Sequence, residues 1–161
     1  EASTQPEKKV LRTAIVYSPV TGIAADLSTA PDEGFAEGMM GEGAVVTPKD
    51  PVICAPEDGE VEFIFDTKHA IGLATESGLE LLIHIGVDTV ELGGKFYTAH
   101  VKDGDVVKKG QTLITFDMDA IKAAGYDVTT PLIVTNTDDY EEVKMLAEGT
   151  VNNGSEVLEV K

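Results

Sequence analysis

The sequence predicts an all-β domain, built as an antiparallel β-sandwich or flattened barrel with short helical turns. Sixteen glycines and seven prolines divide the 161 residues into short β-rich runs, a spacing typical of sandwiches and barrels. Hydrophobic residues form 42% of the chain and charged residues 25%, the usual mixture of a globular protein. The length favours one domain. We expect residues 1–9, which are mostly polar, to be a linker or disordered N-terminus, and residues 10–161 to be the single domain.

Each candidate strand is a short run of β-branched, aromatic or alternating residues bounded by turn-forming residues. In chain order, the strands are expected at residues 11–17, 22–26, 35–39, 44–47, 52–54, 59–65, 70–75, 79–85, 95–98, 112–116, 131–134 and 155–161. Residues 118–124 are rich in helix-forming side chains and predict a helix of one or two turns. Residues 138–146 begin with two aspartates and carry Lys144 near their end, which suits the helix dipole and predicts a second helix.

The composition excludes several classes of partner. With 12 Lys and Arg against 29 Asp and Glu, the formal net charge is −17. This charge repels phosphate backbones and anionic lipid, so neither nucleic acid nor a membrane surface is an expected partner. The single cysteine, Cys54, permits no intrachain disulfide and fits a reducing, cytoplasmic setting. The glycine-rich loops that bind ATP or dinucleotides are absent, and no cofactor is expected.

His84 has the most informative surroundings of the three histidines. It lies in residues 78–90, GLELLIHIGVDTV, where side chains alternate across a predicted strand. The odd-numbered residues from 81 to 87 are all apolar and predict the core side, so His84 is expected to face outward. Gly86 is expected to leave room over the ring and to expose a backbone carbonyl, which holds one ring nitrogen and leaves the other free.

His69 is expected to lie beside His84. The two are 15 residues apart with a turn at residues 76–78 between them, so antiparallel strands would bring their rings together. Thr67 shares a face with His69 and can fix its tautomer. Such a pair suggests either a nucleophile with a supporting partner or part of a zinc site. No third ligand has a telling spacing, so adventitious zinc at His69 and His84 is favoured over a dedicated zinc site.

The remaining histidine and the cysteine have weaker contexts. His100 has no partner that the sequence identifies, and we expect it to be structural or exposed. Cys54 lies between apolar neighbours and is expected to be a small buried hydrophobe rather than a reactive thiolate.

The residues around the two histidines closely resemble the glucose-class IIA component of the bacterial phosphoenolpyruvate-dependent sugar phosphotransferase system. The likeness runs from about residue 16 to residue 160. Residues 78–90 resemble the family's phosphorylation-site signature, and residues 67–70 supply the second histidine at the matching separation. Shorter matching segments are residues 18–22, 35–37, 41–43 and 55–59.

This resemblance implies a phosphotransferase that carries a phosphoryl group on histidine. His84 would accept the group on Nε2 from the phosphohistidine of the small carrier HPr and pass it to a cysteine on the IIB domain of a sugar permease. His69 would stabilise the phosphoryl group, and Thr67 would orient His69. The Gly86 carbonyl would hold Nδ1 of the phosphorylated ring. Neither Mg²⁺ nor a nucleotide is implied.

Apolar residues near these positions are candidates for partner docking, because a dry rim protects phosphohistidine from water. By resemblance and apolar character they are Phe35, Met39, Met40, Val45, Phe65 and Leu82. For the two methionines, core packing is an equally weighted alternative. Asp32 and Asp88 match acidic positions near the site and are candidates to meet an arginine of the donor, with a plain surface charge as the favoured alternative for each alone. The family often has Phe where this chain has residues 71–72, Ile-Gly, which predicts a thinner rim there.

The sequence leaves two other functions open. Residues 106–113 resemble the strand–turn pattern of biotinyl and lipoyl carrier domains, although Lys68 is a poor match to their modified lysine. A metalloenzyme that uses His69 and His84 is the third hypothesis. The expected location is cytoplasmic, either as a free protein or as a cytoplasmic domain of a permease that supplies the only link to the membrane. The sequence does not specify the sugar.

Overall fold

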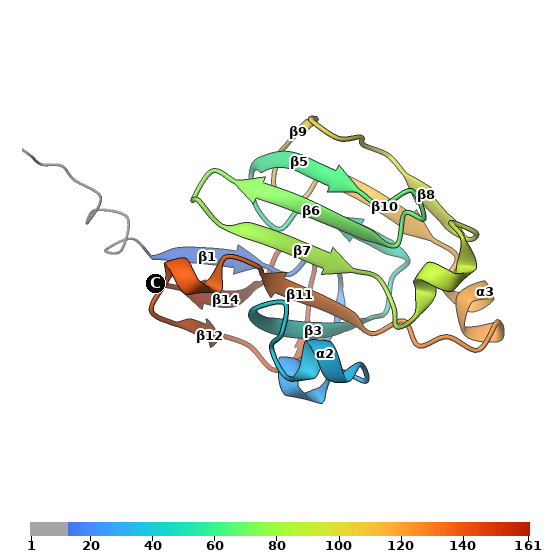
Figure 1. Cartoon of the computed structure of the whole chain (residues 1–161), viewed down its shortest axis with the longest axis horizontal. Coiled ribbons are helices and arrows are strands. Elements are labelled where there is room, and N and C mark those ends of the chain that lie inside the picture. Colours follow the sequence, from blue (N-terminus) through green and yellow to red (C-terminus); the bar gives the residue numbers. More distant parts are fainter. Residues whose placement is uncertain (1–12) are drawn as a thin grey trace, which may run out of the picture.

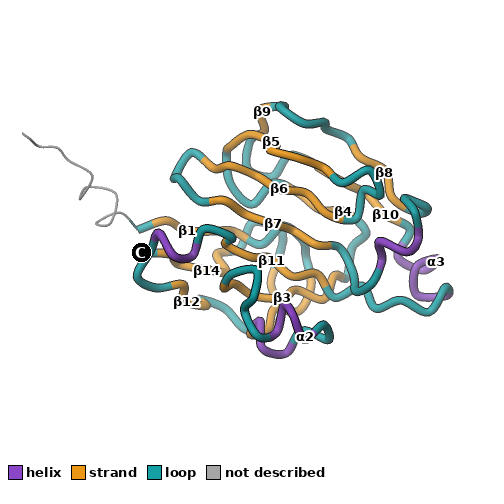
Figure 2. The backbone as a smooth tube through the Cα atoms, viewed as in Figure 1, coloured by secondary structure: helices purple, strands orange, loops and turns teal. Residues whose placement is uncertain are grey.

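The structure is a computed structural model that describes residues 13–161. The expected linker, residues 1–9, lies outside the described residues, as do the first three residues of the predicted domain. In the part described, every strand pair is antiparallel and most of the chain outside the strands is loop (Figure 2). The all-β fold class is therefore confirmed.

The largest sheet has eight strands and carries the two histidines of interest. Its order is β13-β2-β3-β11-β7-β6-β5-β9. The bounds are β2 Gly22–Asp26, β3 Glu42–Pro48, β5 Gly59–Ile64, β6 Ala70–Thr75, β7 Glu80–His84, β9 Val106–Val107, β11 Thr130–Val134 and β13 Gly149–Val151. Figure 1 shows β5, β6 and β7 as neighbouring strands joined by short turns.

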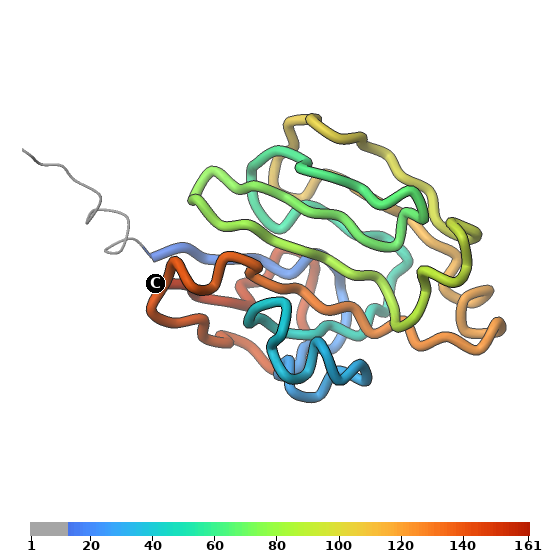
Figure 3. The backbone as a smooth tube through the Cα atoms, in the orientation of Figure 1, coloured from blue at the N-terminus to red at the C-terminus, as the bar shows by residue number. Residues whose placement is uncertain are grey.

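Two three-stranded sheets complete the β-structure, with the orders β1-β14-β12 and β4-β10-β8. Their bounds are β1 Ala14–Tyr17, β4 Val52–Cys54, β8 Tyr97–Ala99, β10 Thr112–Phe116, β12 Val143–Met145 and β14 Glu156–Val160. Ala14 pairs with Val160, so the first described strand and the last strand run side by side at one end of the molecule (Figure 3).

The main core lies between these sheets. It includes Val16 of β1, Leu158 of β14, Ile53 of β4 and Ile114 of β10, all fully buried. From the large sheet it takes the alternate side chains that the sequence assigns to the inner face, including Ile83 of β7. Burying these aliphatic side chains on both layers is what holds the sandwich together.

A second, smaller apolar cluster covers part of the outer face of the large sheet. Short helical segments supply its cover: η1 Leu27–Thr29 and α2 Glu33–Ala36, which lie beyond β3 in Figure 1. The buried members are Leu27, Ala30, Val45, Ala70, Leu82 and Ile133, with Ala25, Phe35 and Ala36 packed against them. The strand that ends at His84 therefore buries apolar side chains on both faces, Leu81 and Ile83 in the main core and Leu82 in the smaller cluster.

The helix predicted at residues 118–124 is confirmed as α3, Met118–Ala123. It begins where the Asp117 side chain accepts a hydrogen bond from the Ala120 N–H. Two further 3₁₀ turns are η2 Thr89–Leu92 and η3 Thr137–Asp139. No helix within residues 13–161 has the length and apolar character needed to cross a bilayer.

The strand predicted at residues 35–39 is wrong. This segment contains the end of α2 and the following turn, because Asp32 Oδ1 accepts hydrogen bonds from the N–H groups of Gly34 and Phe35 and begins a helical turn. Gly38 and Gly41 both take positive φ, at 77° and 131°, which suits a turn and not a strand.

The helix predicted at residues 138–146 is also wrong. The two aspartates form only the 3₁₀ turn η3, and Val143–Met145 is strand β12, which pairs with β14. Strand pairing with a segment more than ten residues away outweighs the local dipole preference. The sequence also missed two short strands of the large sheet, β9 and β13.

Candidate active site

The two histidines lie at neighbouring ends of β6 and β7. His84 is the last residue of β7 and pairs with Ala70, the first residue of β6. His69 directly precedes Ala70, and its backbone carbonyl accepts a hydrogen bond of 2.6 Å from the Ile85 N–H. The antiparallel register therefore fixes the backbones on which both rings stand.

The predicted proximity of the rings is confirmed. Their centroids are 4.7 Å apart and the planes meet edge to face, at 82°. His69 is almost fully buried, with 1% of its surface exposed, whereas His84 is partly exposed. The Phe35 ring lies 5.0 Å from the His84 ring and the Phe65 ring 5.4 Å from the His69 ring. Each imidazole thus has one histidine neighbour and one phenylalanine neighbour.

The Gly86 carbonyl defines the tautomer of His84. It lies 2.8 Å from Nδ1, and because a carbonyl oxygen can only accept, Nδ1 carries the hydrogen. Nε2 therefore keeps its lone pair. The prediction that Gly86 exposes a carbonyl to one ring nitrogen is confirmed.

The reason for glycine at position 86 differs from the expected one. Gly86 is buried and has φ of 94°, a conformation that disfavours any side chain. A Cβ there would lie 2.5 Å from the Thr89 methyl carbon and 3.0 Å from the Asp127 carbonyl oxygen. Close packing of the backbone against η2, and not free space over the imidazole, excludes a side chain here.

Thr67 lies within hydrogen-bond distance of the His69 ring, as the sequence predicts, whereas its orienting role stays a prediction. Its hydroxyl oxygen lies 2.7 Å from Nδ1 of His69. The turn between them is tight: the Lys68 N–H donates to the Phe65 carbonyl at 2.7 Å, and Lys68 adopts φ of 62°. This turn brings the Thr67 side chain against the His69 ring, two residues further along the chain.

Both rings are neutral near pH 7. Burial, and to a smaller extent the nearby His84, lower the pKa of His69 to about 4, because a buried cation loses its hydration and two cationic rings would repel each other. Burial also lowers the pKa of His84, against the opposing effects of the Gly86 carbonyl and of Asp32 and Asp88. A neutral His84 ring with its hydrogen on Nδ1 is a nucleophile at Nε2.

The two candidate acidic residues lie near the site, but Asp32 also has a structural role. Both raise the pKa of His84 through their negative charge. Asp32 caps the start of α2, the segment that carries Phe35 to the His84 ring. Asp88 is exposed and takes a left-handed conformation, with φ of 60°, directly before η2.

The candidate docking residues divide into exposed and covered ones. Met39 and Met40 are 77% and 48% exposed on the turn after α2, so the alternative of core packing is wrong. Phe65 is 45% exposed and Phe35 is partly buried. Val45 and Leu82 are only 3% and 5% exposed, because α2 and η1 cover them, so they support the surface from below and offer little of it to a partner.

The sequence missed Phe63 as part of this surface. Its side chain is 36% exposed and stacks on Phe65 with ring centroids 5.5 Å apart. The Phe63 ring also lies over Gly72, where a Cβ would meet it at 2.3 Å. The rim expected to be thin at residues 71–72 is thus filled from the neighbouring strand. The alternation of Phe63, Phe65 and His69 along the chain was the signal that could have identified it.

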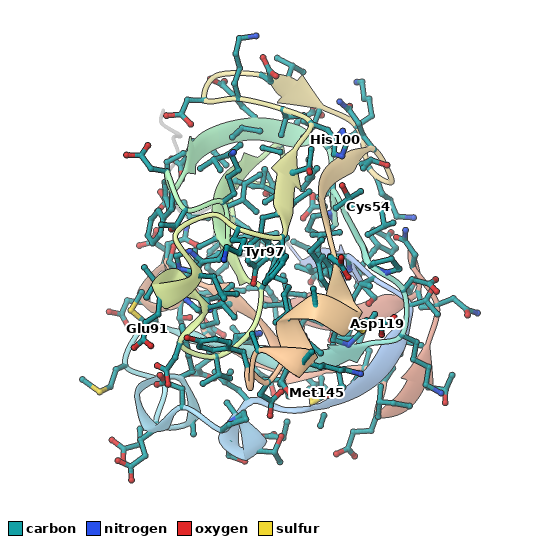
Figure 4. All side chains as sticks on the ribbon, turned by 90° about the vertical axis from the view of Figure 1, so that its right-hand side faces the viewer. Cys54, Glu91, Tyr97, His100, Asp119 and Met145 are labelled. Carbon is teal, nitrogen blue, oxygen red and sulfur yellow. The ribbon has the colours of Figure 1, made fainter. Side chains whose placement is uncertain are left out.

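The remaining predictions from the sequence concern metal binding, Cys54 and His100. No group of three or more metal-ligating side chains occurs among residues 13–161, and adventitious zinc at the histidine pair stays a prediction. Cys54 is buried. His100 is exposed directly after β8 (Figure 4). Its Nε2 lies 2.8 Å from the Thr115 hydroxyl, a partner that the sequence did not reveal.

Comparison with known proteins decides the family. The family model described as phosphoenolpyruvate-dependent sugar phosphotransferase system, EIIA 1, matches residues 14–140. The chain belongs to this EIIA family. The resemblance inferred from residues 67–70 and 78–90 is therefore confirmed, and the biotinyl or lipoyl carrier alternative finds no support.

The relatives of this EIIA domain are of two kinds. A glucose-specific EIIA component from Oceanobacillus iheyensis is 46% identical over 146 residues, 90% of this chain and 88% of that protein. A beta-glucoside-specific EIIBCA component from Dickeya chrysanthemi is 46% identical over 151 residues, and one from Bacillus subtilis is 48% identical over 140. This chain spans only 24% and 23% of those two proteins, although they cover 94% and 87% of it.

A solved structure supports the same assignment. Glucose permease IIA from Mycoplasma capricolum superposes with a TM-score of 0.86 at 32% identity, covering 93% of this chain and 97% of that chain. The family model, the glucose-specific EIIA relative and this solved structure therefore agree that the chain is an EIIA domain of the sugar phosphotransferase system family.

Proposed function

We propose that this EIIA domain accepts a phosphoryl group on Nε2 of His84 from the phosphohistidine of HPr and passes it to a cysteine of a IIB domain. The observation that carries the proposal is the hydrogen bond of 2.8 Å between Nδ1 of His84 and the Gly86 carbonyl. It leaves the lone pair on Nε2 of a neutral, partly exposed ring, which is the form that attacks phosphorus.

The first transfer needs no metal ion or nucleotide. The Nε2 lone pair forms a bond to phosphorus as the nitrogen–phosphorus bond of the donor breaks, and that bonding pair returns to the donor ring. His84 keeps its Nδ1 hydrogen and becomes positively charged. The Gly86 carbonyl and the negative charges of Asp32 and Asp88 stabilise that charge as it develops. The second transfer reverses these events when a cysteine thiolate attacks the same phosphorus.

His69 serves the phosphoryl group in this proposal. With the Thr67 hydroxyl donating to Nδ1, the His69 ring carries its hydrogen on Nε2 and can donate it to a phosphoryl oxygen. The ring is neutral before transfer, so it does not repel the ring that becomes cationic. A dianionic phosphoryl group nearby raises the pKa of His69, which strengthens the interaction once the group is in place.

Four exposed apolar side chains, two beside the histidine pair and two on the turn after α2, are the proposed docking surface for both partners. Phe63, Phe65, Met39 and Met40 combine flat rings with flexible thioethers, which suits a surface that binds two differently shaped proteins in turn. The relatives include both EIIBCA proteins and a separate EIIA component, so a IIB partner in the same polypeptide or in another one fits the proposal.

Labelling with radioactive phosphoenolpyruvate, enzyme I and HPr tests the assignment. His84→Ala should abolish acid-labile labelling, whereas His100→Ala, which removes an exposed histidine from another sheet, should label normally. His69→Gln should accept the label but fail to pass it to a purified IIB domain. Labelling that persists in His84→Ala removes His84 from this role, and normal transfer by His69→Gln removes His69.

A further inference from the structure

The backbone immediately after His84 is held by two buried hydroxyl groups. The Ile85 carbonyl accepts hydrogen bonds from the Thr89 hydroxyl at 2.7 Å and from the Tyr97 hydroxyl at 2.8 Å. Thr89 is fully buried and Tyr97 is 5% exposed. The Ile85 N–H is bonded on its other side to the His69 carbonyl. The peptide groups on both sides of Ile85 are therefore fixed in position.

The next peptide group is fixed as well, and it aims the carbonyl that binds His84. The Val87 N–H donates to the Asp127 carbonyl at 2.9 Å. The Gly86 carbonyl belongs to the same planar trans unit and so points in the opposite direction, toward Nδ1 of His84. With the units before and after it both held, Gly86 has no freedom to rotate its carbonyl away from the ring.

The two hydroxyl groups come from elements outside the β6–β7 pair. Thr89 begins η2 and Tyr97 begins β8, and Figure 4 shows Tyr97 among the side chains of the interior. The Thr89 methyl group packs against Gly86, which adds a steric constraint to the hydrogen bond. Burial raises the pKa of Tyr97 above its ordinary value, so its hydroxyl stays a donor throughout the physiological range.

We propose that Thr89 and Tyr97 are positioning residues for phosphoryl transfer at His84. By holding the Ile85 carbonyl they keep the Gly86 carbonyl on Nδ1, and this keeps the lone pair on Nε2. When either hydroxyl is removed, the Ile85–Gly86 peptide gains freedom and the ring samples the tautomer with its hydrogen on Nε2, which has no lone pair on Nε2 to attack phosphorus. The role in transfer rests on the proposed function, whereas the effect on the ring does not.

The variants Tyr97→Phe and Thr89→Val each remove one hydroxyl while keeping the volume of the side chain. Thr89→Ser retains the hydroxyl and is the rescue variant. Ile53→Val, a buried change on β4, controls for a general loss of stability. Two quantities are measured in each purified domain: the His84 tautomer ratio by nitrogen NMR of the unphosphorylated ring, and the rate of labelling by phospho-HPr.

We expect Tyr97→Phe and Thr89→Val each to raise the ratio of the Nε2–H to the Nδ1–H tautomer about fivefold, as the loss of one hydrogen bond of about 1 kcal/mol supplies. Labelling should slow only in proportion to the accompanying fall in the reactive Nδ1–H fraction. Ile53→Val should match the wild type in both quantities. Thr89→Ser, which keeps the hydroxyl but loses the methyl group packed on Gly86, should lie closer to the wild type than Thr89→Val does. An unchanged tautomer ratio in Tyr97→Phe overturns the proposal, even if labelling slows. If the wild type takes no phosphoryl group on His84, the proposed function fails, and the tautomer ratio still decides whether these residues position the ring.

Discussion

The buried, neutral His69 makes the stability of the domain depend on pH. Its pKa in the folded protein is about 4, below the reference value of 6.5 for an unfolded histidine. Between these values the unfolded chain binds a proton that the folded domain excludes. The contribution of His69 to the free energy of unfolding is therefore fully present above pH 6.5, and it is lost as the pH drops toward 4. From these two values, the loss between pH 8 and pH 5 is about 2 kcal/mol for this one ring.

His69→Gln removes the titrating group but keeps a side chain that can bond to Thr67. Urea unfolding, followed by far-ultraviolet circular dichroism because the chain has no tryptophan, gives the free energy of unfolding at each pH. The wild type should lose about 2 kcal/mol more than His69→Gln between pH 8 and pH 5. His100→Gln, a change at an exposed ring, should keep the wild-type loss. Equal losses in the wild type and His69→Gln would refute the conclusion that burial keeps His69 neutral.

Two further predictions concern the segment around α2. Asp32→Asn keeps a capping side chain but removes its charge, so it should lower the pKa of His84 further and slow phosphorylation by phospho-HPr without changing stability. Asp32→Ala removes the cap too and should cost about 1 kcal/mol in urea unfolding; equal stability of the two variants would contradict the capping role. Replacing Met39 and Met40 together by Ala should raise the KM for phospho-HPr severalfold while the free energy of unfolding stays within about 0.5 kcal/mol of the wild type, because both side chains are exposed. An unchanged KM would exclude these methionines from docking.

The sequence predicts the strands around the site well because their signal is local. Alternation along residues 78–90 identifies the core side of β7 and the outward direction of His84, and both follow from the two-residue period of a strand. The short turn between His69 and His84 also predicts that their rings meet. Local alternation fails at α2, where the Asp32 side chain competes for backbone N–H groups and starts a helix in a segment that looks like a strand.

The sequence alone determines the two histidines of the site and Thr67 beside them, because these predictions depend on neighbouring residues along the chain. It also determines the acidic character of the chain, which is a matter of composition. Only the tertiary structure decides which outward-facing side chains stay exposed. Val45 and Leu82 face outward on their strands but lie beneath α2, whereas Phe63 fills the space over Gly72. The contacts of Thr89 and Tyr97 with the Ile85 carbonyl likewise depend on how η2 and β8 pack. Burial and tautomer at the site are set by such contacts between distant segments, and no local pattern in the sequence encodes them.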